Sequence, residues 1–170
     1  MNIIFFGSPS YSSNVLSYLV SGKHSVKAVV TQDIKTGKKR KDIKTPVGIF
    51  SEQSNIQTYY PNNLSDPKFI QTLKNSESDI FVIYAYGKIL PKELIGIPKY
   101  GVINIHCSLL PKWRGAAPIQ RALLNKDKTT GITFFRIDES LDTGKIISKY
   151  EYKISDSDDS LSLQESLTAL

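Results

Sequence analysis

Two kinds of segment alternate along this chain when its apolar and polar positions are compared. The first kind is a short segment dominated by apolar residues, which predicts a β-strand. Ile80 to Ala85 is unbroken in this respect, as is typical of a strand that is covered on both faces. The predicted strands are Asn2 to Phe6, Val26 to Thr31, Ile80 to Ala85, Val102 to His106, Ile132 to Ile137 and Ile146 to Ile154.

The second kind of segment carries apolar residues at helical spacing and begins with helix-start residues. Ser8, Pro9 and Ser10 precede a predicted helix whose apolar positions run from Tyr11 to Leu19, and Gly22 ends it. Proline at the first helical position favours a helix start because its missing N–H would have no partner there. Four further helices are predicted in this way: around Val47 to Ser54, over Phe69 to Leu73, over Ile119 to Leu124, and from Leu161 onwards.

The repeated order of strand, helix and strand predicts an α/β fold with a mostly parallel sheet flanked by helices. In such folds ligands bind beyond the carboxyl ends of the strands, so polar residues that follow a strand deserve most attention. The pattern leaves the order of the strands open. The last predicted helix is cut short at Leu170, which predicts that the sequence is the N-terminal part of a longer protein.

Composition and charge narrow the class of protein. With 170 residues, 40% of them hydrophobic and 22% charged, the chain suits one globular domain, residues 1–170. Cys107 is the single cysteine and excludes an internal disulfide, so a reducing compartment and a cytoplasmic location are expected. The N-terminal segment lacks a basic leader, and no apolar run is long enough to span a membrane. The formal net charge of +6 favours an anionic partner.

Several common chemistries lack their minimal residues. Gly7-Ser8-Pro9 follows a strand without the glycine spacing of a dinucleotide site, and Gly37-Lys38-Lys39 is not followed by the Ser or Thr of a P-loop. Two histidines without a metal-type arrangement make catalytic zinc improbable, so we expect no metal site.

A more informative segment begins at the end of the fourth predicted strand. Alternation along a strand places Asn104 and His106 on one face, where an amide and an imidazole can converge on one substrate atom. Asp142, in a later turn, is a carboxylate that could orient such a histidine. These three residue types suit acyl transfer, in which an oxyanion forms and a proton must move. Each also has a simpler structural explanation as a cap or a hydrogen-bonded strand end, so spacing alone leaves catalysis open.

Two longer motifs carry a resemblance to a known family. Asn104-Ile105-His106-Cys107-Ser108-Leu109-Leu110-Pro111, continued by Trp113-Arg114-Gly115 and followed by Leu141-Asp142-Thr143-Gly144, resembles the folate-dependent formyltransferases that use 10-formyltetrahydrofolate. The resemblance implies a Rossmann-like formyltransferase sheet and a catalytic set of Asn104, His106 and Asp142. It further implies that folate is bordered by Tyr86, Gly87, Ser108, Leu109, Leu110 and Pro111.

Within this family the stretch from Trp113 to Arg121 is most similar to the branch that formylates the α-amine of methionine on initiator tRNA. That resemblance implies that a basic loop containing Lys38, Lys39, Arg40 and Lys41 binds the tRNA. Phosphate neutralisation is consistent with these charges, although an isolated basic run is more often a solvated loop. Lysine offers a point charge where arginine offers a bidentate fork, so detailed reading of the acceptor stem is less expected here.

Two rival functions remain open at this stage. A sugar-nucleotide amine N-formyltransferase shares the chemistry but would not depend on tRNA. An inactive RNA-binding fragment is the more distant rival, because the tRNA branch carries a second, OB-like domain that adds RNA-binding surface and that this sequence does not contain. We therefore expect initiator Met-tRNA and folate as partners, with no membrane and no obligate protein partner.

Overall fold

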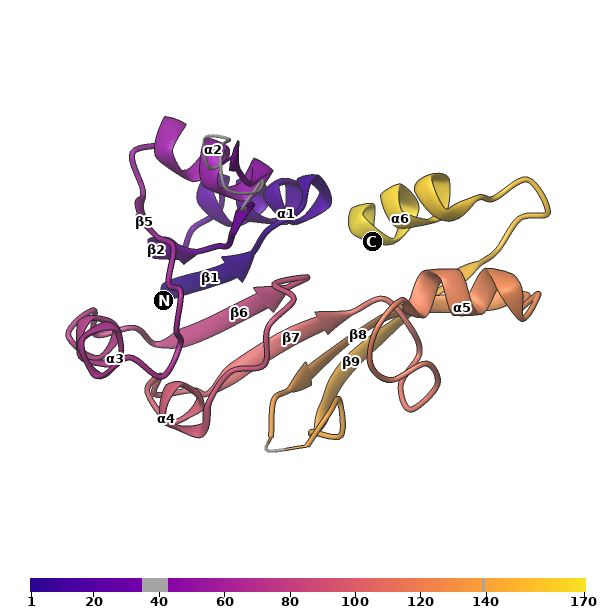
Figure 1. Ribbon diagram of the computed structural model, residues 1–170. Coiled ribbons are helices and arrows are strands. Elements are labelled where there is room, and N and C mark those ends of the chain that lie inside the picture. The colour runs from indigo at the N-terminus through magenta and orange to yellow at the C-terminus, as the bar shows by residue number, and fades with distance from the viewer. Residues whose placement is uncertain (35–42, 139) are drawn as a thin grey trace. The chain divides into compact units, whose positions relative to one another are not determined.

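The computed structural model describes residues 1–34, 43–138 and 140–170. These residues divide into two compact units, Met1–Val102 and Ile103–Leu170, and each unit is described by itself. Figure 1 shows the elements of both. The basic residues predicted to bind tRNA, Lys38, Lys39, Arg40 and Lys41, lie outside the described residues.

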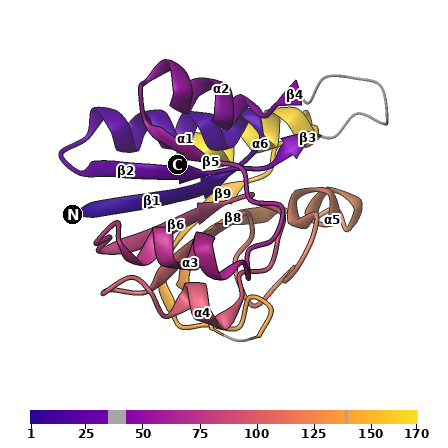
Figure 2. The same ribbon diagram turned by 60° about the vertical axis from the view of Figure 1, so that its left-hand side comes forward.

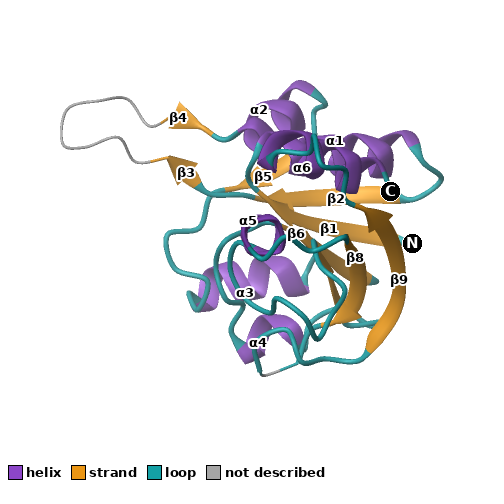
Figure 3. Ribbon diagram, turned by 90° about the vertical axis from the view of Figure 1, so that its right-hand side faces the viewer, coloured by secondary structure: helices purple, strands orange, loops and turns teal. Residues whose placement is uncertain are grey.

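The first unit is built on a parallel sheet. Its elements are β1 (Asn2–Gly7), α1 (Ser10–Ser21), β2 (Ser25–Val30), β3 (Asp33–Ile34), β4 (Ile43–Lys44), α2 (Pro46–Gln53), β5 (Gln57–Tyr59), α3 (Pro67–Lys74), β6 (Ile80–Tyr84) and α4 (Lys92–Ile95). Strand β1 pairs in parallel with both β2 and β6, and β2 pairs in parallel with β5. Strands β3 and β4 form a separate antiparallel pair, visible in Figure 3.

Burial explains why β1 is central to this sheet. Ile4, Phe5 and Phe6 are fully buried, because a strand paired on both edges and covered on both faces leaves no side chain in water. Figures 1 and 2 show α1 and α2 together on one side of this sheet and α3 on the other. Thr45 and Asp66 cap α2 and α3 through their side-chain oxygens, directly before Pro46 and Pro67, as the two Xaa-Pro signals predict.

The second unit is built on an antiparallel sheet. It contains β7 (Val102–His106), α5 (Pro118–Leu124), β8 (Thr129–Arg136), β9 (Ile146–Lys153) and α6 (Ser160–Ala169), with the unit boundary inside β7. Strand β8 lies between β7 and β9 and pairs antiparallel with each. Asp159 caps α6 by accepting hydrogen bonds from the backbone N–H groups of Leu161 and Ser162. The α/β class with a parallel sheet is confirmed, and the antiparallel pairing of the later strands is an addition to it.

Candidate active site

Strand β7 presents the first two candidate residues. Asn104 lies opposite Phe135 of β8, and His106 lies opposite Thr133, so both side chains project from one face as the alternation predicts. The Phe135 ring meets the His106 ring edge-on, with centroids 6.5 Å apart. Only 8% of the His106 side chain is exposed. Among the described residues the half-buried Asn104 amide has no hydrogen-bond partner, which leaves its donor and acceptor atoms available to a ligand.

Asp142 reaches His106 from the turn between β8 and β9. Its Oδ2 atom lies 3.7 Å from His106 Nδ1, and 12% of its side chain is exposed. This separation is too long for a hydrogen bond but lies within ion-pair distance of a protonated imidazole. The structure thus brings together two residues that are separated by 36 positions and whose proximity spacing alone left open.

Glycine in the turn makes this position of Asp142 possible. A Cβ atom on Gly144 would lie 1.7 Å from the Arg136 carbonyl oxygen, so no larger residue fits beside the end of β8. Asp142 itself has a φ of 50°, in the left-handed region that aspartate tolerates better than most residues. The Leu-Asp-Thr-Gly motif therefore has a local structural basis.

The loop after β7 contacts both His106 and Asp142. The Trp113 carbonyl oxygen lies 2.8 Å from His106 Nε2, and the Gly115 backbone N–H donates to Asp142 Oδ2 at 2.7 Å. Since a carbonyl oxygen can only accept, His106 Nε2 must carry a hydrogen. The backbone of this loop turns sharply, with positive φ angles at Trp113, Gly115 and Ala117. These turns direct the Trp113 carbonyl to His106 and the Gly115 N–H to Asp142.

Residues 108–111 are held by a buried threonine of β8. Thr133 Oγ1 donates to the Ser108 carbonyl at 2.6 Å and accepts from the Leu110 N–H at 3.1 Å. Lys149 of β9 also donates to the Leu110 carbonyl, and the Leu110–Pro111 peptide is cis. Ser108 Oγ donates to the Lys112 carbonyl, so in this geometry its hydroxyl proton is used within the loop. Folate binding by these residues stays a prediction.

Tyr86 and Gly87, the other predicted folate residues, follow β6 in the first unit. The Tyr86 ring is buried and meets Phe6 edge-on, with centroids 5.5 Å apart. Its buried hydroxyl has no hydrogen-bond partner among the described residues, and burial raises the pKa of that hydroxyl. The Tyr86 carbonyl accepts from Gln32 Nε2, and Gly87 has a φ of 81°.

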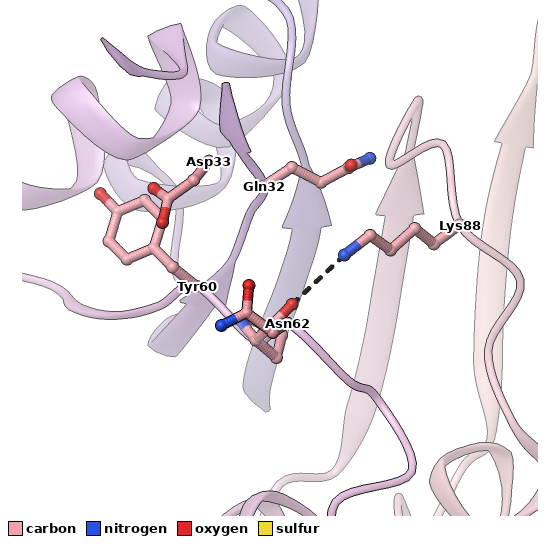
Figure 4. Close-up of a pocket in the computed structure, with 6 residues that line it drawn as sticks. Gln32, Asp33, Tyr60, Asn62 and Lys88 are labelled. Carbon is pink, nitrogen blue, oxygen red and sulfur yellow. Dashed lines mark hydrogen bonds between the residues drawn. The ribbon is translucent and has the colours of Figure 1, made fainter. Parts of the chain in front are cut away.

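A pocket of about 300 Å³ lies next to this segment, within the first unit (Figure 4). Its lining comes from three segments that follow the carboxyl ends of β2, β5 and β6, where open parallel sheets bind ligands. The lining residues are Gln32, Asp33, Tyr60, Pro61, Asn62 and Lys88. Lys88 Nζ donates to the Pro61 carbonyl at 3.2 Å, drawn as the dashed line in Figure 4.

A cluster on α2 fixes the Tyr60 wall of this pocket. Tyr60 Oη donates to Glu52 Oε1 at 2.7 Å, and Lys44 Nζ lies 2.5 Å from Glu52 Oε2. The hydrogen bond from Lys44, followed by that from Tyr60, lowers the pKa of the Glu52 carboxyl. Burial, followed by the bond to Glu52, raises the pKa of the Tyr60 hydroxyl. The ring therefore stands in a defined place at physiological pH, with its hydroxyl protonated.

Other kinds of site find no support in the described ranges. In residues 1–34, 43–138 and 140–170, no group of three or more His, Cys, Asp or Glu side chains is arranged to hold a metal ion. None of the helices in these same ranges is long and apolar enough to cross a membrane.

Comparison with known protein families identifies the family of the chain. The model of the family described as formyl transferase matches residues 1–170. The chain belongs to the formyl transferase family. This confirms the family that the Asn104-to-Gly115 and Leu141-to-Gly144 motifs predicted.

Relatives within the formyl transferase family cover the whole chain. A methionyl-tRNA formyltransferase of Prochlorococcus marinus (strain MIT 9312) is 45% identical over 172 residues, and one of Wolbachia sp. subsp. Drosophila simulans (strain wRi) is 43% identical over 171 residues. Each alignment covers 100% of this chain and, respectively, 52% and 57% of the relative. The chain thus spans about half the length of these relatives.

Solved structures support the formyl transferase fold. Phosphoribosylglycinamide formyltransferase from Bacillus halodurans has a TM-score of 0.81 at 24% identity, covering 99% of this chain and 88% of that one. The enzyme of the same name from Anaplasma phagocytophilum has a TM-score of 0.83 at 22% identity, covering 99% and 80%. At such identities the likeness shows the fold alone, and it confirms the predicted Rossmann-like formyltransferase class.

Sequence reasoning missed the groups that hold the candidate site together. The Trp113 carbonyl and the Gly115 N–H are backbone atoms, which carry no residue-type signal. Thr133 and Asp127, which anchors Trp113 through its indole N–H, are single polar residues in otherwise unremarkable segments. The Trp-Arg-Gly motif was recognised as a family feature, but its spacing gave no indication of a contact with His106.

Proposed function

We propose that this chain is the catalytic domain, residues 1–170, of an enzyme that transfers a formyl group from 10-formyltetrahydrofolate to the α-amine of initiator methionyl-tRNA. The observation that carries the proposal is the approach of Asp142 to His106, 3.7 Å apart, on the strand face that also presents Asn104. Membership of the formyl transferase family and 43–45% identity to proteins named methionyl-tRNA formyltransferase support the choice of acceptor.

The three side chains divide the chemistry between them. The Asn104 amide, which has no partner among the described residues, donates to the oxyanion that forms when the amine attacks the formyl carbon. Protonated His106 is the second donor, through Nδ1, because its Nε2 hydrogen is directed at the Trp113 carbonyl. Asp142 lies beside Nδ1, where its carboxylate orients the imidazole. It assists transfer of the proton from the attacking amine to the departing N10 nitrogen of the folate, as the bond between N10 and the formyl carbon breaks.

The first unit has features that fit a polar heterocyclic donor. When bound, the folate supplies an activated formyl group. The pocket beside Tyr86 and Gly87 combines an aromatic wall with amide, carboxylate and ammonium groups, which suits hydrogen bonding to a ring that carries both donors and acceptors. The Tyr86 hydroxyl is buried and has no hydrogen-bond partner among the described residues, so it is available to a ligand group. In the second unit the family resemblance assigns residues 108–111 to the same ligand.

The remaining parts of the proposal follow from the acceptor. Lys38, Lys39, Arg40 and Lys41 would neutralise phosphates of the tRNA, since lysine and arginine contacts dominate affinity for nucleic acid. A role in translation initiation implies a cytoplasmic location. The mechanism assigns no step to a metal ion.

Release of tetrahydrofolate tests the proposed function directly. The purified chain is mixed with 10-formyltetrahydrofolate and, in separate reactions, initiator Met-tRNA or an amino-sugar nucleotide, with His106→Ala as the control variant. We expect release that requires both Met-tRNA and His106. Release with the sugar nucleotide alone would assign the chain to sugar-nucleotide N-formylation. If the chain binds Met-tRNA but neither binds folate nor releases product, it is an RNA-binding fragment.

A further inference from the structure

Asp127 is a buried carboxylate outside every motif that the mechanism uses. It lies in the turn between α5 and β8, and only 7% of its side chain is exposed. Three side chains donate to it: Lys112 Nζ at 2.8 Å, Trp113 Nε1 at 2.8 Å and Asn125 Nδ2 at 2.6 Å. Burial raises the pKa of Asp127, but these bonds together outweigh burial and hold the pKa below its ordinary value. Asp127 is therefore charged at physiological pH.

Two of the three donors belong to the loop that contacts the catalytic pair. Trp113 gives its indole N–H to Asp127 and its carbonyl to His106, so one residue joins the two groups. Trp113 has a φ of 58°, which a bulky residue adopts only where its surroundings hold it there. The Lys112 ammonium adds a second restraint, since it lies 5.3 Å from the centroid of the Trp113 ring.

The restraint on Trp113 has a consequence for the protons of His106. Neutral imidazole carries one hydrogen, on either Nδ1 or Nε2, and the hydrogen bond at one nitrogen selects between them. A carbonyl at Nε2 selects the form with hydrogen on Nε2. Nδ1 then carries no hydrogen in the neutral form and faces Asp142. If Trp113 turned, both forms of His106 would be accessible.

We propose that Asp127 is a positioning residue: by holding the Trp113 indole, it keeps the Trp113 carbonyl on His106 Nε2 and the Nδ1 atom directed to Asp142. The inference deepens the proposed function, because it assigns His106 a single neutral tautomer suited to that reaction. Its geometric basis lies within the second unit and does not require any substrate.

The ¹⁵N spectrum of the histidine side chains tests this inference without an activity assay. The chain has only two histidines, and His24→Gln assigns their signals. In the neutral state at high pH we expect His106 to show a single tautomer with hydrogen on Nε2. Trp113→Phe removes the indole N–H and keeps an aromatic ring, and Asp127→Ala removes the acceptor. Both variants should give averaged signals from two tautomers.

Asn125→Ala is the matched control, because the Asn125 side chain donates to the same carboxylate and has no hydrogen bond to Trp113 or His106 among the described residues. It should keep the single tautomer. The backbone spectrum shows whether Trp113→Phe is folded. If the folded variant also keeps the single His106 tautomer, the inference is wrong whatever the activity of the chain. The same measurement stands if no formylation is found, so failure of the proposed function and failure of this inference are distinguishable.

Turnover provides a second readout. Misplacement of a catalytic group by about 1 Å can cost on the order of 100-fold in rate. We therefore expect Asp127→Ala and Trp113→Phe each to lower kcat by roughly 10- to 100-fold with KM nearly unchanged, and the double variant to lose little more than either single one. Additive losses in the double variant would mean that the two residues act separately.

Discussion

Each unit contains a cluster in which a lysine and an aromatic side chain donate to one carboxylate, but the two clusters differ in burial. In the first unit Glu52 accepts from Tyr60 and Lys44, and 38% of its side chain is exposed. In the second unit Asp127 accepts from Trp113 and Lys112 and is 7% exposed. The exposed cluster supports a pocket wall, whereas the buried one supports a loop that contacts His106. The same kinds of group can thus hold an aromatic side chain at a pocket wall or in a loop beside His106, and the two carboxylates differ in their exposure to solvent.

The largest expected effect comes from a pair of Asn→Ala substitutions, one on β7 beside His106 and one in the pocket of the first unit. Asn104→Ala removes an oxyanion donor on β7 and should lower kcat by about 100-fold or more. Asn62→Ala removes one amide from the pocket of the first unit, and the loss of one hydrogen bond should raise KM for the folate by only about fivefold. Steady-state kinetics with both substrates measures both. A folded Asn104→Ala variant that keeps most of its kcat would contradict the assigned role of this amide.

Removal of the two carboxylates should show the difference in stability. Asp127→Ala leaves the partly buried Trp113 indole N–H without its partner and should reduce the free energy of unfolding by about 2 kcal/mol. Glu52→Ala should cost less, since water can solvate its former partners, and its effect should shrink as salt is added. Urea unfolding at low and high ionic strength gives both values. Equal losses in the two variants would show that burial does not distinguish the clusters.

Acid should reduce the contribution of Asp127 to the free energy of unfolding, by less than the loss expected for Asp127→Ala. The pKa of Asp127 is lower in the folded chain than its ordinary value of 3.8, so the folded state binds its proton less readily than the unfolded state does. Its contribution to stability is present above about pH 4 and is lost as the pH falls through the folded pKa. The difference in unfolding free energy between the unsubstituted chain and Asp127→Asn should therefore decrease between pH 5 and pH 3. A constant difference over this range would show that the Asp127 carboxylate does not titrate as described.

The strands with the strongest apolar character were predictable from the sequence. Strands β1, β6 and β7 match the predicted segments Asn2 to Phe6, Ile80 to Ala85 and Val102 to His106 to within a residue. A short apolar run of this kind is typical of a buried strand. The short elements β3, β4, β5 and α4 were not predicted, since two to four residues do not establish a period. Strand β8 begins at Thr129 rather than Ile132, because its first residues are held by pairing with β9 and not by their own hydrophobicity.

The candidate site was predictable only at the level of residue type. Alternation gives the common face of Asn104 and His106, but the approach of Asp142 depends on the turn after β8 and on the space beside Gly144. The Trp113 carbonyl could not be found, since every residue carries one and only a folded loop with φ of 58° directs this one at His106. Asp127 was missed because an acidic residue between two lysines is typical of a solvated turn.

Reaction of the Cys107 thiol can report local unfolding of the second unit. It is the single thiol of the chain, it is only 8% exposed, and it lies between His106 and Ser108, with Gln164 of α6 3.8 Å from its sulfur. A thiol reagent must wait for the surrounding segment to open before it can react, as an amide hydrogen must before it exchanges. The labelling rate of Cys107 under native conditions, compared with that of a free thiol, therefore measures the free energy of this local opening.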